Sequence, residues 1–377
     1  MNATTYNLYR EHAWPTFRCG NIGQADAVEL KCLLVSKGVR VDGEIYERFG
    51  NTYRINPSPS TCNSMKLSDG TNVQLTDWPS SPFRLKVSDG KPALFCEEEF
   101  VCYVTFHPYS DFYSQKTSSG LPFIGNAVLQ GCDFVSFPYL WHCEYAAAGK
   151  PCQFCFNKPQ SPAVPYSDVA EIVRYATLHD KVNSVQLTGG STFSGQNEHR
   201  HIVSYLNAIA NSGADLTGEI LLYITPPTHL AYIDEYFSLG ASRIACSIEV
   251  WDREKAQIIT PGKSQYATRE RHLNALTYIA ETYGNNKAFC NFVIGLESVE
   301  TLKEGATWLA RRGIIPSASV WMPMGRAVMG SLETPDVTYF RRVKEMLSDL
   351  YIRYNLSPAG GCGLNVCIEK DISMARI

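Results

Sequence analysis

Three cysteines near the middle of the chain are the residues most able to carry chemistry. Cys143, Cys152 and Cys155 lie in the segment HCEYAAAGKPCQFCF, the last two at a C-x-x-C spacing. Three thiolates can hold three irons of a [4Fe–4S] cluster and leave the fourth iron free to bind a small molecule. A structural zinc site normally takes a fourth protein ligand, and residues 156–175 contain no His or Cys. The spacing therefore favours an open, reactive cluster over a closed zinc site.

The composition is that of a globular protein with a large core. The chain has 377 residues, 45% of them hydrophobic and 19% charged, and a net charge of −3. We therefore expect no nucleic-acid partner, and with no apolar run near the ~20 residues that span a bilayer we expect no membrane partner. Thirteen cysteines, an odd number behind an N-terminus unlike a signal peptide, indicate a reducing, cytoplasmic location.

Residues 1–120 predict a small α+β N-terminal domain. Residues 23–38 have the pattern of a short helix. Two SDG turns, at 68–70 and 88–90, have apolar or β-branched residues on both sides, which is typical of β-hairpins. The turn-forming residues of 107–123 are expected to connect this domain to the next.

From residue 121 the pattern becomes a regular alternation of strand and helix. The expected strands are 126–137, 184–190, 219–227, 241–250, 287–295 and 314–324, and the expected helices are 167–180 (with Ser167 as N-cap), 198–213, 229–240, 267–284, 300–313 and 334–354. Such alternation predicts an α/β fold with a parallel sheet. We expect a partial (β/α)6 TIM-like barrel over 121–335, with an open doubly wound sheet as the alternative, and a C-terminal helix and Gly/Cys-containing tail over 336–377.

Candidate functional residues fall at the expected carboxyl ends of these strands, where either fold would place its site. The cysteine loop follows the first strand. The other strand ends carry Thr188, Gly189 and Gly190; Ser247 and Glu249; Ile294, Gly295 and Glu297; and Met322, Pro323 and Gly325. We therefore expect all of them to meet at one edge of the sheet.

In this arrangement the segment from about 122 to 330 resembles the radical S-adenosylmethionine (SAM) enzymes. In that family a loop after the first strand holds the [4Fe–4S] cluster, and an aromatic residue, here Phe154, precedes the last cysteine. The resemblance implies that Cys143, Cys152 and Cys155 are the cluster ligands. One departure is plain: the spacing here is C-x8-C-x2-C instead of C-x3-C-x2-C. Cys143 is therefore the ligand most in question, and Cys132, in LQGCDF, is its alternative.

The same resemblance implies how SAM is held. The glycine pair of TGGST, with Thr188, Gly189 and Gly190, would bind the methionine amino group, and Ser247 and Glu249 the ribose. Ile294 and Gly295, in NFVIGLES, would pack the adenine. For the methionine carboxylate the candidate is Arg271, with Arg269 second.

The implied activity is reductive cleavage of SAM at the cluster. This yields a 5′-deoxyadenosyl radical, which abstracts hydrogen from a small-molecule substrate for rearrangement, C–C bond formation, sulfur insertion or cofactor biosynthesis. The strand-end pattern is most similar to the biotin-synthase and hydrogenase-maturase branch. An electron donor such as flavodoxin or ferredoxin is implied. The alternatives are a radical SAM methyltransferase and a non-catalytic zinc or iron–sulfur scaffold protein.

Three further residues are candidates for contact with the substrate. Cys362 and Cys367 lie in the glycine-rich tail SPAGGCGLNVCIEK, and Arg326 follows the sixth expected strand, where it could bind an anionic group. The two cysteines could also be ordinary thiols, or could join Cys19 or Cys62 at an auxiliary cluster.

Overall fold

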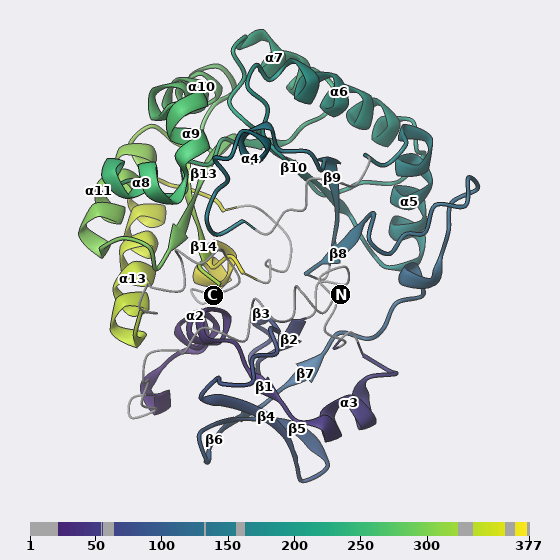
Figure 1. Cartoon of the computed structure of the whole chain (residues 1–377), viewed down its shortest axis with the longest axis vertical. Coiled ribbons are helices and arrows are strands. Elements are labelled where there is room, and N and C mark those ends of the chain that lie inside the picture. The colour runs from purple at the N-terminus through teal and green to yellow at the C-terminus, as the bar shows by residue number, and fades with distance from the viewer. Residues whose placement is uncertain are drawn as a thin grey trace.

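The main feature of the fold is a curled seven-stranded sheet with helices on its outer side (Figure 1). The structure, a computed structural model, describes residues 22–53, 55, 64–131, 133–155, 163–322, 335–358 and 366–374. The strands of this sheet are β8 (Val128–Gln130), β9 (Phe134–Leu140), β10 (Ser184–Gly189), β11 (Ile220–Tyr223), β12 (Arg243–Ala245), β13 (Ala288–Ile294) and β14 (Ile315–Val320), in spatial order β14-β13-β12-β11-β10-β9-β8.

Strands β9 to β14 are parallel, so the predicted partial barrel of six β/α units is confirmed. The helices that connect and cover them are α5 (Tyr166–His179), α6 (Gln196–Ala210), α7 (Ala231–Ser238), α10 (Arg269–Tyr283), α11 (Val299–Ala310) and α13 (Val337–Arg353). The strands are apolar because both faces are covered; all seven residues of β13 are buried. Among the described residues, no helix is long and apolar enough to cross a bilayer.

Two local predictions were wrong. The expected strand 126–137 is a hairpin, in which β8 pairs antiparallel with β9 around a turn where Gly131 has φ +58°. Because residues on both sides of that turn are apolar, the sequence pattern indicated one continuous buried strand. Ser167 is not an N-cap, because α5 already begins at Tyr166 and the capping position is Pro165, which makes no side-chain cap.

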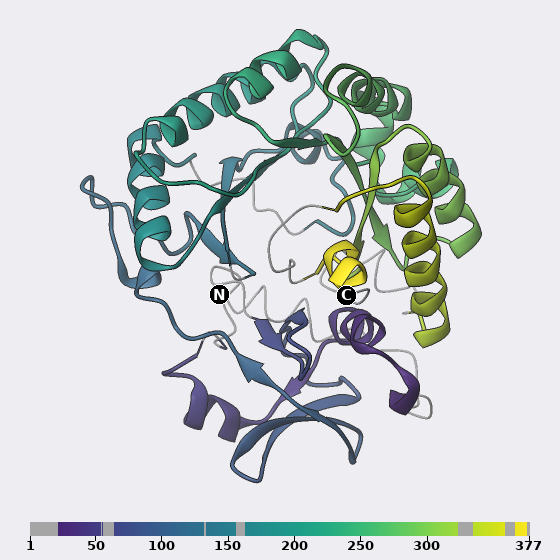
Figure 2. The same cartoon turned by 180° about the vertical axis from the view of Figure 1, so that it is seen from behind.

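Short helices that the sequence analysis did not predict lie at the site end of the sheet and near the C-terminus. They are α4 (Glu144–Ala147), α8 (Arg253–Ile259), α9 (Pro261–Tyr266) and α14 (Glu369–Met374). The C-terminal segment runs along β14, where Val320 N–H donates to the Val366 carbonyl (2.9 Å) and Ile368 N–H to the Ala318 carbonyl (3.1 Å). Seen from both sides, α14 lies on the inner side of the arc (Figures 1 and 2).

The N-terminal region forms two small sheets opposite the curled sheet (Figure 1). Both predicted hairpins are present, as β2–β3 and β4–β5, and the second turn places Asp89 (φ +50°) and Gly90 (φ +74°) in the left-handed region that tight hairpins require. The elements are η1 (Ile22–Gln24), α2 (Ala27–Lys37), β1 (Arg40–Val41), α3 (Gly43–Phe49), β2 (Ser64–Lys66), β3 (Asn72–Gln74), β4 (Phe83–Ser88), β5 (Lys91–Cys96), β6 (Glu99–Tyr103), β7 (Thr105–Phe106) and η2 (Asp111–Ser114).

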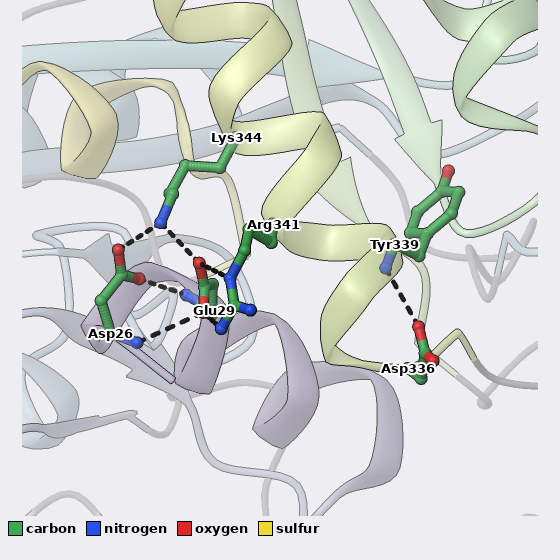
Figure 3. Close-up of polar contacts among 6 residues, drawn as sticks. All are labelled: Asp26, Glu29, Asp336, Tyr339, Arg341 and Lys344. Atoms are coloured by element: carbon green, nitrogen blue, oxygen red, sulfur yellow. Dashed lines mark hydrogen bonds and ion pairs between the residues drawn. The ribbon is translucent and has the colours of Figure 1, made fainter. Parts of the chain in front are cut away.

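Helix α2 joins this region to the C-terminal part of the barrel through charged contacts (Figure 3). Arg341 on α13 donates to both carboxylate oxygens of Glu29 (3.1 and 2.9 Å), and Lys344 contacts Glu29 and Asp26. Lys31, also on α2, has its Nζ 2.6 Å from the carboxylate of Asp371 on α14, and both side chains are buried. The two ends of the described chain are therefore tied together by a buried charge pair.

We expect Lys31→Met to lower the free energy of unfolding by about 3–5 kcal/mol, because it leaves the Asp371 carboxylate buried without its partner. The matched control is Arg353→Met, which removes a cation from the exposed Arg353–Asp349 pair and should cost about 0–1 kcal/mol. Urea unfolding of both variants measures the difference. Equal losses would show that the buried pair is not the stronger contact.

Candidate active site

The cysteine loop follows β9 and is fastened at two points. Cys143 is the residue before α4, and the N–H of the next residue, Glu144, donates to the Ser191 carbonyl (2.8 Å). At the other end of the loop, Gln153 N–H donates to the Ile259 carbonyl at the end of α8 (2.8 Å). The loop is thus held between the residues that follow β10 and those that follow β12.

The glycine pair after β10 lies against the backbone that enters this loop. A Cβ on Gly190 would lie 2.1 Å from the His142 carbonyl oxygen, and one on Gly189 would lie 2.9 Å from the Leu140 carbonyl oxygen. Real Cβ atoms do not approach so closely, so only glycine fits at position 190 without a backbone shift. The close approach brings the end of β10 and the start of the cysteine loop together.

A cavity of about 130 Å³ opens at this edge of the sheet. Its lining combines strand-end polar groups with aromatic rings: Tyr139, Tyr145, Thr188, Gly189, Ser191, Tyr223, Ile224, Thr225, Ser247, Glu249, Lys263, Ala267 and His272. Four of the residues predicted for cofactor binding, Thr188, Gly189, Ser247 and Glu249, therefore share one cavity.

Glu249 is held in a fixed position at this cavity. Its backbone has φ +71°, which is unusual for a residue other than glycine and is often found at functional sites. Its N–H donates to the Asn291 carbonyl (3.0 Å), and its carbonyl accepts from Val293 N–H (2.9 Å). The carboxylate accepts from Lys263 Nζ (2.7 Å) and from Asn291 Nδ2 (2.9 Å). Both the backbone and the carboxylate are thus oriented before any ligand arrives.

Only part of the Arg271 guanidinium forms hydrogen bonds with the described residues. Its Nη1 donates to the carbonyls of Phe193 (3.3 Å) and Tyr266 (3.1 Å), whereas Nε and Nη2 are buried and have no hydrogen-bond partner among the described residues. Buried donors are nearly always paired, so these two atoms suit an anionic ligand. Arg269, in contrast, lies over the ring of Trp251, 3.5 Å from its centroid.

The other predicted cofactor contacts are packing residues in the structure. Phe154 packs against a small apolar cluster at the strand ends, formed by Val250, Ile259, Val293, Leu296 and Trp321. Ile294 is buried, and Gly295, with φ +105°, donates its N–H to the Tyr339 hydroxyl (3.0 Å). Glu297 accepts the N–H groups of Trp251 and Asp252, so it orders the turn before α8.

The three cysteines share one loop, but they are not placed as ligands of a common ion. Within the described ranges, no three His, Cys, Asp or Glu side chains are grouped as metal ligands. Burial raises the pKa of the Cys152 thiol to about 12, the Lys263 ammonium opposes this rise, and Cys155, Glu249 and Cys143 add to it. Cluster binding by Cys143, Cys152 and Cys155 therefore stays a prediction.

Of the three residues predicted to contact the substrate, Cys367 lies among the described residues. Cys362, Arg326 and Cys132 lie outside the described residues, as do Cys19 and Cys62. Cys367 is buried beside β14, where its Sγ lies 3.2 Å from Ser319 Oγ, and burial raises its pKa. It is not among the residues that line the cavity.

Two charged residues at the site were missed by sequence reasoning. Lys263 lies on the unpredicted helix α9. Glu198, in the first turn of α6, is buried and accepts from the Tyr139 hydroxyl (2.7 Å) and Thr225 N–H (2.7 Å), so it joins the ends of β9 and β11. Burial raises the pKa of Glu198 to about 7, although these hydrogen bonds oppose the rise. An acidic residue in the first turn of a helix is ordinarily exposed, so nothing in the sequence indicated that Glu198 is buried.

Comparison with known proteins gives one curated relative and several solved structures. Bacteriochlorophyllide c C-7(1)-hydroxylase of Chlorobaculum limnaeum is 23% identical over 343 residues, which cover 76% of this chain and 83% of the relative. Coproporphyrinogen III oxidase (HemN) from Escherichia coli, described as a radical SAM enzyme, is 14% identical, with a TM-score of 0.38 over 60% of this chain and 53% of its own. HydG, a maturase of the [FeFe]-hydrogenase, is 14% identical, with a TM-score of 0.46 over 59% and 50%.

The chain is similar to radical SAM enzymes. The match spans about half the length of the two solved structures, HemN and HydG. No family model matches the chain.

We predict that Glu198→Gln changes how stability depends on pH. A carboxyl whose pKa rises from 4.5 to about 7 on folding contributes stability below pH 4.5, and this contribution is lost as the pH rises to about 7. Glutamine keeps the shape and does not titrate. The free energy of unfolding of the variant, minus that of the unmodified protein, should therefore rise by about 3 kcal/mol between pH 4.5 and 7.5. Urea unfolding across this range measures the difference, and two parallel pH profiles would contradict it.

Proposed function

We propose that this protein is a radical SAM enzyme. It binds a [4Fe–4S] cluster through Cys143, Cys152 and Cys155, and binds SAM in the cavity beside them. It then forms a 5′-deoxyadenosyl radical and abstracts hydrogen from a small-molecule substrate. An electron donor of the flavodoxin or ferredoxin type supplies the electron that starts each cleavage.

The observation that carries this proposal is the convergence of three kinds of group at one edge of the sheet. Thiols that suit iron lie in a loop held against Gly190 and Ser191. A cavity lined by Gly189, Ser247 and Glu249 lies beside it. Arg271 donates to the Phe193 carbonyl in the loop after β10, and two of its buried donor atoms have no hydrogen-bond partner among the described residues. A structural zinc site would explain the first feature and leave the other two without a purpose.

The side chains present have the chemistry that both cofactors need, although the three thiols are not grouped as ligands of one ion in the structure. Three thiols and no fourth ligand in the loop suit a cluster with an open iron. The unpaired Nε and Nη2 of Arg271 suit the methionine carboxylate, and the oriented carboxylate of Glu249 suits the ribose hydroxyls. When bound, the cluster and SAM supply one-electron reduction and the 5′-deoxyadenosyl radical.

The protein's own contribution is orientation and the exclusion of water. Glu249 is fixed by Lys263 and Asn291, so little ordering remains to be done when a hydroxyl group docks. Tyr139 and Tyr145 are buried behind the cavity, and burial raises the pKa of both hydroxyls, so they stay neutral. Such buried walls limit the access of water to the cavity.

The comparisons support a small-molecule substrate. The names of the relatives, a bacteriochlorophyllide hydroxylase and a coproporphyrinogen oxidase, describe enzymes that act on small organic molecules. The first adds hydroxylation to the reactions that the sequence analysis considered. A radical SAM methyltransferase and a non-catalytic scaffold remain the alternatives, and the next experiment separates them from the main proposal.

The test is anaerobic reconstitution with iron and sulfide, followed by EPR of the dithionite-reduced protein with and without SAM. We expect a [4Fe–4S]⁺ signal that changes on addition of SAM, with 5′-deoxyadenosine released. Alanine variants of Cys143, Cys152 and Cys155 should each lose most of the bound iron. Cys32→Ala, which removes a buried thiol of α2, should keep it. Bound zinc, or a cluster indifferent to SAM, would leave the scaffold alternative. SAM methyl label in the product would favour the methyltransferase.

We further expect Arg271→Met to weaken SAM binding at least tenfold, because it removes a charge-assisted contact worth about 1.5–3 kcal/mol. Arg269→Met is the matched control: it removes the same charge two residues away, from a side chain that stacks on Trp251. Equilibrium binding of SAM to the cluster-loaded proteins measures both. A larger loss in Arg269→Met would exchange the assignments of the two arginines.

A further inference from the structure

Glu198 holds the first turn of α6 against the ends of two strands. Its side chain is only 1% exposed. Its Oε1 accepts from the Tyr139 hydroxyl of β9 (2.7 Å) and from the Thr225 N–H just after β11 (2.7 Å). Tyr139 and Thr225 both line the cavity, and β10 lies between β9 and β11 in the sheet. One carboxyl group therefore joins α6 to the cavity wall on both sides of β10.

The loop after β10, residues 190–195, is fixed at both of its ends. At the β10 end, Gly190 lies against the start of the cysteine loop. At the α6 end, Thr192 Oγ1 donates to the second oxygen of Glu198, Oε2 (3.4 Å), and accepts from the Gly195 N–H (3.0 Å). Gly195 is the N-cap of α6, so Glu198 ties both the loop and the start of the helix to the strand ends.

This loop carries one of the two carbonyls that orient Arg271. The guanidinium donates through Nη1 to the carbonyls of Phe193 (3.3 Å) and Tyr266 (3.1 Å). The Phe193 ring contacts the rings of Tyr145 and Tyr266, with centroids 5.8 and 4.6 Å away. A guanidinium is planar and rigid, so the position of Nη1 also sets the direction in which Nε and Nη2 point.

We propose that Glu198 is a positioning residue for SAM, which acts through the loop after β10 and through Arg271. This inference rests on the proposed function, in which Arg271 binds the methionine carboxylate. Glu198 is not among the residues that line the cavity, so it acts on the ligand only through its neighbours. Without its carboxyl group the Phe193 carbonyl is held less firmly, and the guanidinium turns away from the direction that a carboxylate requires.

The test is equilibrium binding of SAM to the cluster-loaded variants. We expect Glu198→Ala to weaken binding about tenfold, because it misdirects the guanidinium whose loss in Arg271→Met has at least that effect. Glu198→Gln keeps the shape and an oxygen acceptor, so its affinity should stay within about threefold of the unmodified protein. The matched control is Asp168→Ala, which removes a buried acid from the first turn of α5, away from the cavity lining, and should also stay within about threefold.

A double-mutant cycle tests the route through Arg271. If Glu198 acts by directing the guanidinium, Glu198→Ala should weaken SAM binding less than about twofold in protein that already carries Arg271→Met. A merely structural role would weaken binding equally in both backgrounds, so equal losses overturn the inference. It is also wrong if Glu198→Ala binds SAM as tightly as the unmodified protein while Arg271→Met does not.

Amide hydrogen exchange of the full chain without SAM covers the case in which Glu198→Ala holds no cluster. The Phe193 N–H donates to Glu144, and the Gly195 N–H to Thr192 Oγ1. We expect both amides to exchange about tenfold faster in Glu198→Ala, and at an unchanged rate in Glu198→Gln. Unchanged exchange in Glu198→Ala overturns the inference.

Thr192→Val covers the case in which Glu198→Ala does not fold. It removes the hydroxyl that links Glu198 to the loop and leaves the contacts of Glu198 with Tyr139 and Thr225 in place. We expect weaker SAM binding and faster exchange of the Gly195 amide, and if neither changes the inference is wrong. An unmodified protein that binds no SAM overturns the proposed function itself, and is recognised before any variant is compared.

Discussion

The candidate site depends on the close approach of two backbone segments, at Gly190 and His142. With no side chain at position 190, the end of β10 lies against the start of the cysteine loop, and the Glu144–Ser191 hydrogen bond then holds the two together. Two further features of the site depend on the segments that this contact brings together. The loop after β10 carries the Phe193 carbonyl, which orients Arg271, and the cysteine loop provides the surface on which α9 packs. The site is therefore one connected unit and not a set of independent side chains.

The charges of the site are arranged in a chain across three strand ends. Lys263 contacts Glu249, Glu249 accepts from Asn291, and Asn291 accepts from Ser319, whose hydroxyl also lies near Cys367. The C-terminal segment does not line the cavity, but Ser319 and Asn291 link its Cys367 to the cavity residue Glu249. Neutral and charged groups are paired along the whole chain, which is what makes a buried polar network stable.

Much of the fold was readable from the sequence. Continuous apolar runs such as 287–295 marked buried parallel strands, and glycines and polar residues at their ends marked the edge where a site should lie. The hairpin at Gly131 was missed because both of its arms are apolar. Helices α8 and α9 were missed because each is a short segment whose position is set by tertiary contacts, as Gly262 shows by its fit against Tyr145. For the same reason the buried roles of Lys263 and Glu198 could not be predicted: both look like ordinary surface charges until the packing is known.

The buried pair of Lys31 and Asp371 has a consequence for how the protein is made. The two residues are 340 positions apart in the chain, so the pair forms only after the chain up to Asp371 has left the ribosome. Until then, the Lys31 ammonium on α2 lacks the carboxylate that it contacts in the folded protein. This buried contact of the N-terminal region is therefore completed only when α14 arrives. Contacts of such long range slow folding, and they extend the time during which the nascent protein is open to misassembly.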